Sequence, residues 1–176
     1  MGARERVVEI RDARAGEYDA VGRVTVDTYV GEGFINPASA YVAELADTPA
    51  RARAAQILVA VHEGEIVGSL TVARPGTAFA DIARPGELEF RMLAVAKAAR
   101  GLGVGTALVD AVFEIARAEG FDAVVLTTMP AMVDARRMYD RIGFVHAPER
   151  DWFTMAGLPL TVMRFATGPD QAASPA

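Results

Sequence analysis

Residues 87–109, ELEFRMLAVAKAARGLGVGTALV, decide the fold. The apolar run 90–96 has the length of a buried β-strand. A glycine-rich segment, RGLGVG at 100–105, follows it and leads into an apolar helical pattern from about residue 104. Glycines at alternate positions allow positive φ angles and a close approach of the backbone to a ligand. This stretch therefore predicts a strand, a glycine-rich turn and a helix N-terminus in series.

The predicted turn has the features of an anion-binding site. The first N–H groups of a helix have no partner within it, and the helix dipole places a partial positive charge there. Arg100 adds a full positive charge at the start of the turn. Together these features predict a ligand that carries phosphate groups.

Two common phosphate-binding motifs do not fit the turn. A P-loop needs a lysine directly after its last glycine, whereas Lys97, the only lysine of the chain, precedes the glycines. A Rossmann fingerprint needs an acidic residue at the end of the next strand, and the strand expected at 123–129 ends without one. A glycine-rich turn that binds no ligand stays open as an alternative.

The rest of the chain alternates between strand and helix patterns. The expected elements are strand 7–10, helix 16–31, helix 37–47 with a further helical turn to 55, strands 56–62, 66–73 and 87–96, helix 104–119, strand 123–129, helix 131–142, and strands 144–146 and 160–166. Their order, β-α-α-β-β-β-α-β-α-β-β, predicts a mixed α/β fold. We expect an antiparallel hairpin from 56–62 and 66–73, and a parallel pair from 87–96 and 123–129.

The remaining segments set the domain organisation. Two Pro-Gly pairs lie in 74–86, so this segment is expected to be a loop, and it could lie over a site. A second loop is expected at 147–159. The length suits one domain over residues 1–167, and the composition predicts a disordered tail at 168–176.

Composition excludes several classes of function. The net charge of −5 argues against general nucleic-acid binding. The absence of cysteine excludes disulfides, thiolate metal sites and an acyl-cysteine intermediate, and the two histidines, His62 and His146, are too far apart in sequence to suggest a zinc site. No leader-like or membrane-spanning apolar run is present, so we expect a cytoplasmic protein without a membrane partner.

Two motifs resemble one family. Leu93-x-Val95 followed by Arg100-x-x-Gly103-x-Gly105 resembles the acyl-CoA motif of the GCN5-related N-acetyltransferases (the GNAT family), R/Q-x-x-G-x-G/A after a strand with L-x-V. The segment 135–144 is similar to the family's A-x-x-L-Y-E-x-x-G-F. The element order over residues 6–166 also matches the family's topology. The resemblance implies acetyl-CoA as co-substrate, no metal, and direct transfer of the acetyl group to a primary amine in a ternary complex.

The resemblance also assigns an acetyl-CoA site. Strand backbone groups would run along the pantetheine arm, and the turn would wrap the pyrophosphate. The implied cofactor-binding residues are Leu93, Ala94, Val95, Arg100, Gly101, Leu102, Gly103, Val104, Gly105, Thr106, Met132 and Arg136. The sequence departs from the family at Met132, where an asparagine is frequent, and at Lys97, where a proline is usual.

Two residues are candidates for proton transfer. By resemblance, Tyr139 would protonate the departing CoA thiolate; a tyrosine that only packs its ring is the alternative. Glu89 would accept the amine proton, directly or through water, with Glu87 as the second choice. Arg91, two positions on, could hold Glu89 ionised. A backbone N–H near Leu93 or Ala94 would stabilise the oxyanion.

The acceptor side of the sequence is less informative. The family places the early helices and the loop before the last strand around the acceptor, which makes Tyr29, Phe34, Tyr41, Arg150, Asp151 and Trp152 candidate wall residues. Arg84 and Arg91 could bind a substrate carboxylate, and His146 could lie near the site. Small molecules and peptides are both open as acceptors. A non-catalytic acyl-CoA sensor and a transferase of another acyl group remain alternatives, and the family also allows a homodimer.

Overall fold

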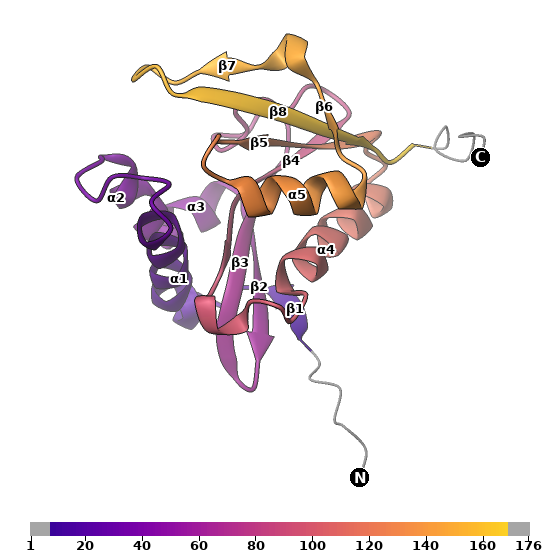
Figure 1. Ribbon diagram of the computed structural model, residues 1–176. Coiled ribbons are helices and arrows are strands. Elements are labelled where there is room, and N and C mark those ends of the chain that lie inside the picture. Colours follow the sequence, from indigo (N-terminus) through magenta and orange to yellow (C-terminus); the bar gives the residue numbers. More distant parts are fainter. Residues whose placement is uncertain (1–7, 169–176) are drawn as a thin grey trace. The chain divides into compact units, whose positions relative to one another are not determined.

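The computed structural model describes residues 8–168, and Figure 1 labels its helices and strands. Hydrogen-bonded strands follow the order β1-β2-β3-β4-β5-β8-β6, with β7 paired to β8. β4 and β5 are parallel, as predicted, whereas β1 and β2 and the three pairings of β8 are antiparallel. This mixed, mostly antiparallel sheet confirms the predicted α/β class.

Contacts within the chain divide it into two compact units. In the described part, one unit holds residues 8–71 and 92–109, and the other holds 72–91 and 110–168. β3 (Glu65–Ala73), β4 (Glu87–Val95) and α4 (Val104–Ala118) contribute residues to both units. The single domain over 1–167 stays a prediction, and the predicted tail lies, from residue 169 on, outside the described residues.

The first unit contains an antiparallel strand pair, whose two strands are separated in sequence by three helices. Its remaining elements are β1 (Glu9–Asp12), a 3-10 turn (Ala15–Glu17), α1 (Tyr18–Gly31), α2 (Tyr41–Ala46), α3 (Thr48–Ala54), β2 (Gln56–His62) and a second 3-10 turn (Lys97–Ala99). β1 pairs with β2 from Glu9↔Val61 to Asp12↔Leu58. α1 packs against α2 and α3, and Val21 of α1 forms a buried cluster with Ile57 and Val59 of β2.

A buried arginine joins the short helices of this unit. Arg51 of α3 is almost fully buried and donates to the carbonyls of Glu44 and Leu45 at the end of α2, at 2.9 and 2.7 Å. Burial lowers the pKa of its guanidinium, although the nearby tyrosines and carboxylates act in the opposite direction. Arg51 therefore caps α2 from within the unit.

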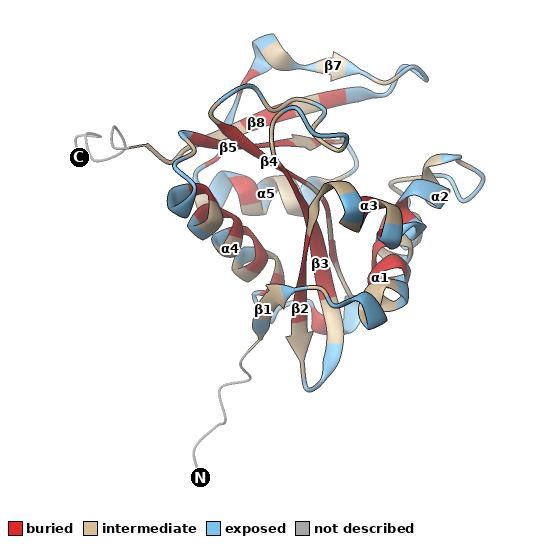
Figure 2. Ribbon diagram, turned by 180° about the vertical axis from the view of Figure 1, so that it is seen from behind, coloured by how far each residue is buried: buried red, intermediate tan, exposed pale blue. Residues whose placement is uncertain are grey.

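The second unit surrounds strand β8. Its remaining elements are β5 (Ala123–Thr128), α5 (Val133–Ile142), β6 (Val145–His146), a 3-10 turn (Pro148–Arg150), β7 (Trp152–Phe153) and β8 (Pro159–Ala166). β5 and the first residues of β4, 87–90, are mostly buried (Figure 2). Helix α5 lies beside β5 and β8 (Figure 1). An aromatic cluster fills the space next to α5. It consists of Phe90, Phe113, Tyr139, Phe144 and Phe165.

Two sequence-based predictions were wrong in detail. The helix expected at 37–47 begins only at Tyr41, because Asn36 Oδ1 accepts from the N–H of Ala38 and Ser39 Oγ accepts from the N–H of Tyr41, which favours local turns over a helix start. The loop expected at 147–159 contains the two-residue strand β7, which is too short for a periodic pattern. The expected loop at 74–86 has no helix or strand, as predicted. The helix expected to end at residue 142 does end at Ile142, where Gly143 follows with a φ of 114°.

Gly68 tests the packing of the first unit. A Cβ at this position of β3 would lie 2.7 Å from Val104 Cγ1 and 3.1 Å from the carbonyl oxygen of Ala94. Gly68→Ala should therefore lower the free energy of unfolding by about 1–3 kcal/mol. In the control, Gly31→Ala on α1, a Cβ would meet nothing within 4 Å. Urea titrations followed by circular dichroism should show a loss only for Gly68→Ala; equal midpoints would contradict this packing.

Candidate active site

Strand β4 brings three charged side chains to one face of the second unit. Glu87, Glu89 and Arg91 alternate along the strand, and each contacts the loop 74–86. The strand register also pairs Glu89 with Val125 of β5, which pairs with Arg164 of β8, so these residues share that face. Charged side chains and a loop backbone therefore meet on one side of the sheet.

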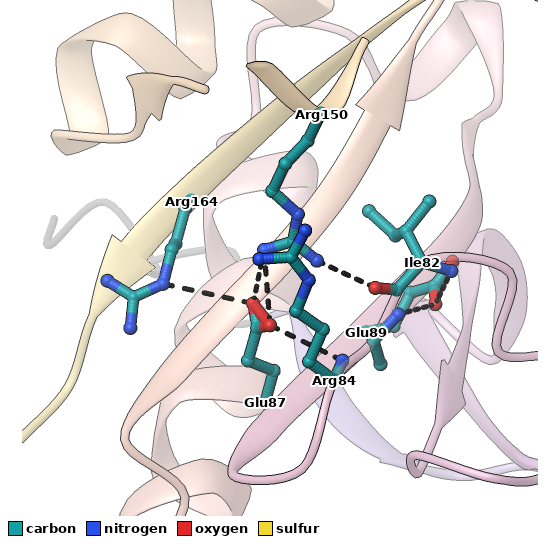
Figure 3. A network of polar contacts seen from close by, with 7 residues as sticks. Ile82, Arg84, Glu87, Glu89, Arg150 and Arg164 are labelled. Atoms are coloured by element: carbon teal, nitrogen blue, oxygen red, sulfur yellow. Dashed lines mark hydrogen bonds and ion pairs between the residues drawn. The ribbon is translucent and has the colours of Figure 1, made fainter. Parts of the chain in front are cut away.

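Glu89, the predicted base, is a buried carboxylate. It is 1% exposed, and its Oε2 accepts hydrogen bonds from the N–H groups of Ile82 and Ala83, both at 3.0 Å (Figure 3). Burial raises its pKa, while these N–H groups and the charge of Arg91 act to lower it. A carboxylate with a raised pKa holds a proton more readily near neutral pH, as a general base requires.

Arg91 contacts the loop as well as acting on Glu89. Its guanidinium lies 3.2 Å from the carboxylate of Asp81 and donates to the carbonyl of Phe79 at 3.1 Å. Its charge favours ionised Glu89, in the direction predicted, but burial has the larger effect and the pKa of Glu89 rises. Arg91 therefore holds the loop and also opposes, without cancelling, the effect of burial on Glu89.

Glu87, the alternative base, belongs to a buried ion pair. Both of its carboxylate oxygens accept from Nη1 of Arg150, at 3.1 and 2.7 Å, and each side chain is only 7% exposed. The N–H of Arg84 donates to the same carboxylate at 3.3 Å, and Nε of Arg164 lies 3.8 Å away (Figure 3). A cavity of about 300 Å³ adjoins this pair. Glu87 is thus bound directly by the charged side chain of Arg150, whereas Glu89 accepts from backbone N–H groups.

Tyr139, the predicted acid, belongs to the opposite face of β4. Its ring contacts Phe90 at 5.9 Å and Phe144 at 5.7 Å between centroids. Because side chains alternate along a strand, Phe90 and its neighbour Glu89 point to opposite faces. Burial raises the pKa of the Tyr139 phenol, and its hydroxyl makes no hydrogen bond to another residue of the described chain. A protonated phenol without a protein partner can donate to a ligand.

The glycine-rich turn belongs to the first unit. Gly101 and Gly103 have positive φ angles of 80° and 74°, as the sequence predicts, whereas Gly105 lies within α4, which begins at Val104. The first bond along the helix runs from the N–H of Ala107 to the carbonyl of Gly103 at 3.0 Å. The earlier N–H groups of the turn have no such bond along the helix, as at any helix start.

Arg100, the predicted phosphate ligand, is paired with an acidic side chain. Its Nη2 lies 2.6 Å from Oε1 of Glu32 at the end of α1, in a pair whose side chains are 42% and 25% exposed. The two residues line a cavity of about 410 Å³ within the first unit, together with Lys97. Thr28 of α1 also donates to the carbonyl of Val95 at 3.4 Å. The end of α1 therefore contacts two of the predicted cofactor-binding residues.

The other predicted cofactor residues divide between the units. Leu93, Ala94, Val95 and 100–106 lie in the first unit; Met132 and Arg136, at the start of α5, lie in the second with Tyr139 and Glu89. Met132 accepts from the N–H of Arg136 at 3.0 Å, and the Arg136 side chain lies 3.4 Å from Asp140. Just before Leu93, Met92 adopts a φ of 56°, a left-handed conformation that redirects the backbone at this point of β4.

The predicted acceptor-wall residues divide in the same way. Tyr29 and Phe34 meet edge to face at 6.0 Å in the first unit, which also holds Tyr41. In the second unit, Asp151 accepts from the N–H of Val162 and lies 2.8 Å from His146 Nε2. Trp152 of β7 has a buried indole N–H with no protein partner among residues 8–168.

Comparison with known proteins decides the family. The model of the acetyltransferase (GNAT) family matches residues 24–144, more than half of the chain. The chain belongs to the GNAT acetyltransferase family. Both motifs that suggested it, at 93–105 and 135–144, lie within the match or end at its last residue.

Relatives of known name agree with this membership. The Xenopus tropicalis protein named "Probable N-acetyltransferase camello" is 37% identical over 86 residues, which are 49% of this chain and 36% of that protein. Human N-acetylaspartate synthetase is 31% identical over 104 residues, 59% of this chain and 32% of that protein. The chain thus spans about a third of the curated relatives it matches. The family and the first of these names agree with the predicted class of enzyme, an N-acetyltransferase.

Solved GNAT structures share the fold. A GNAT-family acetyltransferase from Staphylococcus aureus Mu50 matches with a TM-score of 0.74 at 16% identity, covering 92% of this chain and 100% of that one. The protein yncA of Salmonella typhimurium, solved with its cofactor acetyl-CoA, matches with a TM-score of 0.68 at 19% identity, covering 92% and 95%. At such identities the likeness shows the GNAT fold.

Several contacts of the GNAT site have no signal in the sequence. The Arg150–Glu87 pair joins residues 63 positions apart, and Glu32 lies 68 positions before Arg100. Neither pair has a characteristic spacing. The backbone N–H groups that bind Glu89 cannot be recognised in the sequence, because every residue except proline has one.

The described chain shows neither a metal site nor a membrane-spanning helix. Among residues 8–168, no three histidine, aspartate or glutamate side chains gather as a metal site would require. No helix in the same range is long and apolar enough to cross a membrane.

The Glu87–Arg150 pair should be essential for stability. Glu87→Gln leaves the buried charge of Arg150 without its counter-ion, so the free energy of unfolding should fall by about 3–5 kcal/mol. The control is Glu119→Gln, which breaks the exposed pair with Arg74 (2.8 Å, 36% and 40% exposed) and should cost about 0–1 kcal/mol. Chemical denaturation measures both. A loss for Glu87→Gln no larger than the control's would contradict the account of this pair.

Proposed function

We propose that this GNAT domain transfers an acetyl group from acetyl-CoA directly to a primary amine within a ternary complex. The observation that carries the proposal is that β4 presents Glu89 on one face and the adjacent Phe90 on the other, where the Phe90 ring contacts Tyr139 of α5. A base on one face can serve the amine while an acid on the other serves the thiolate. No cysteine is available for an acyl-enzyme, so direct transfer is the simpler route.

Glu89 is the proposed base. An alkylamine is protonated at neutral pH and must lose a proton before or as its nitrogen attacks the thioester carbon. Glu89 receives that proton, directly or through water. Glu89 accepts only from backbone N–H groups, whereas both oxygens of Glu87 accept from the charged guanidinium of Arg150. This difference supports Glu89 over Glu87.

Tyr139 is the proposed acid. When the tetrahedral intermediate collapses, the carbon–sulfur bond breaks and the thiolate takes the phenol proton; solvent later restores it. What supports this role is the hydroxyl itself, which is protonated at neutral pH and makes no hydrogen bond to another described residue, although burial raises its pKa and so makes it a weaker acid. The oxyanion is assigned to a backbone N–H near Leu93 or Ala94, beside the redirected backbone at Met92.

The donor is assigned to the glycine-rich turn. Gly101, Gly103 and the start of α4 supply N–H groups for the pyrophosphate, and Arg100 and Lys97 supply positive charge. Acetyl-CoA in the solved relatives yncA and a Brucella melitensis GNAT acetyltransferase supports this choice of donor. Met132 and Arg136, which lie on or next to α5 in the second unit, stay predictions as cofactor-binding residues.

The acceptor is an amine, a small molecule or a protein N-terminus. Named relatives include N-acetylaspartate synthetase, and a structural neighbour is the ribosomal-protein-S18-alanine N-acetyltransferase of Escherichia coli. Amino acids and N-terminal peptides are therefore the first acceptors to compare. The cytoplasmic location and the homodimer stay predictions.

Arg100→Ala should weaken acetyl-CoA binding. Loss of one charge-assisted contact to phosphate corresponds to about a tenfold higher Kd in isothermal titration calorimetry. Glu32→Gln removes the competing carboxylate and should lower the Kd, though by less than tenfold, because the exposed pair is worth about 1 kcal/mol at most. An unchanged Kd for Arg100→Ala would remove Arg100 from the donor site.

Substitutions at Tyr139 and Glu89 should separate catalysis from binding. Tyr139→Phe keeps the ring and loses the proton, so kcat should fall by about 10²-fold while the Kd for acetyl-CoA stays unchanged. Glu89→Gln should lower kcat by a similar factor. Thiol release gives the rates and calorimetry the affinities. A full-rate Tyr139→Phe would exclude the acid role, and a full-rate Glu89→Gln would exclude the base role.

A further inference from the structure

Arg150 connects the buried ion pair to the loop that binds Glu89. One guanidinium nitrogen, Nη1, donates to both oxygens of Glu87, and the other, Nη2, donates to the carbonyl of Ile82 at 2.7 Å (Figure 3). The N–H of the same residue, Ile82, donates to Glu89. Ile82 is thus held by Arg150 at its carbonyl and by Glu89 at its nitrogen.

This arrangement leaves Arg150 little freedom. Its side chain is 7% exposed, and the planar guanidinium presents its donors in a fixed fork. Glu87, which binds the same guanidinium, lies on β4 two residues before Glu89, and its side chain is equally buried. The position of the Ile82 carbonyl is therefore fixed relative to the strand that carries the base.

The loop supplies what Glu89 needs to stay ionised when buried. Its Oε2 accepts from Ile82 and Ala83, and Asp81 contributes a further N–H interaction. The segment 80–86 has no helix or strand to hold these N–H groups in place. Side-chain bonds from Arg150, Glu87 and Arg91 do so instead.

We propose that Arg150 is a positioning residue for Glu89: by holding the Ile82 carbonyl against β4, it keeps the N–H groups of Ile82 and Ala83 on the base. The effect of Arg150 on catalysis rests on the proposed function, in which Glu89 is the base. The contact between Arg150 and Ile82, and the effect of Arg150 on the Glu89 carboxylate, do not depend on that role.

Other charges around Glu89 do not replace Arg150. Arg91 favours the ionised form but is engaged by Asp81 and the carbonyl of Phe79. From β5, the neighbour in register is the apolar Val125. From β8, Arg164 approaches Glu87 at 3.8 Å and has no bond to Ile82 among the described residues.

Arg150→Lys is the decisive variant. Lysine keeps the positive charge beside Glu87 but has one ammonium group, which cannot hold Glu87 and Ile82 in the same forked geometry. The matched control is Arg164→Lys, which changes a cation near the same carboxylate without touching Ile82. Circular dichroism checks that both proteins are folded.

The direct readout is the titration of Glu89 itself. In protein labelled with ¹³C at the glutamate carboxyl carbons, Glu89→Gln identifies the Glu89 resonance. Arg150→Lys should raise the pKa of Glu89 by about one unit, the size of one weakened hydrogen bond to a carboxylate, whereas Arg164→Lys should leave it in place. Equal pKa values in the two variants would overturn the proposal.

Kinetics separate this proposal from the proposed function. If Glu89 is the base, the acid limb of the pH profile of kcat/KM should move to higher pH in Arg150→Lys. The shift should equal the rise in the pKa of Glu89, and the plateau at high pH should be retained. A limb that persists unchanged in Glu89→Gln would overturn the base role. The carboxylate titration would then still decide whether Arg150 positions Glu89.

Discussion

The second unit depends on charged side chains that β4 buries. A carboxylate removed from water is costly unless hydrogen bonds or an opposite charge replace its solvent. Glu87 meets this requirement through Arg150, and Glu89 through two loop N–H groups. The same side chains hold the loop 74–86, which has no helix or strand, through its backbone. Glu89, the proposed base, and the loop beside it are therefore held by one set of interactions.

The same strand separates the two proposed proton-transfer groups. Glu89 points to the face with the loop, and Phe90 points to the aromatic cluster that holds Tyr139. Burial raises the pKa of the Glu89 carboxyl and of the Tyr139 phenol. A raised pKa makes a carboxylate a better base but a phenol a weaker proton donor, so burial favours the proposed role of Glu89 and not that of Tyr139.

The sequence predicted what depends on local pattern. The strand, turn and helix of 87–109 and the parallel pairing of β4 with β5 follow from periodicity, glycines and the crossover rule, and the structure confirms them. The start of α2 was missed because side-chain caps at Asn36 and Ser39 outcompeted the helix. Contacts distant in sequence, such as Arg150–Glu87 and Arg100–Glu32, could not be predicted, because only folding brings those residues together.

Direct transfer in a ternary complex is the central claim, and the initial rate of thiol release tests it most directly. The rate would be measured with acetyl-CoA and an amine both varied, first across amino acids, simple alkylamines and N-terminal peptides to find the acceptor. The account predicts turnover with at least one amine and intersecting lines in double-reciprocal plots. Parallel lines, which indicate a covalent acyl-enzyme, or acetyl-CoA binding without turnover on any amine, as a sensor would show, would contradict it.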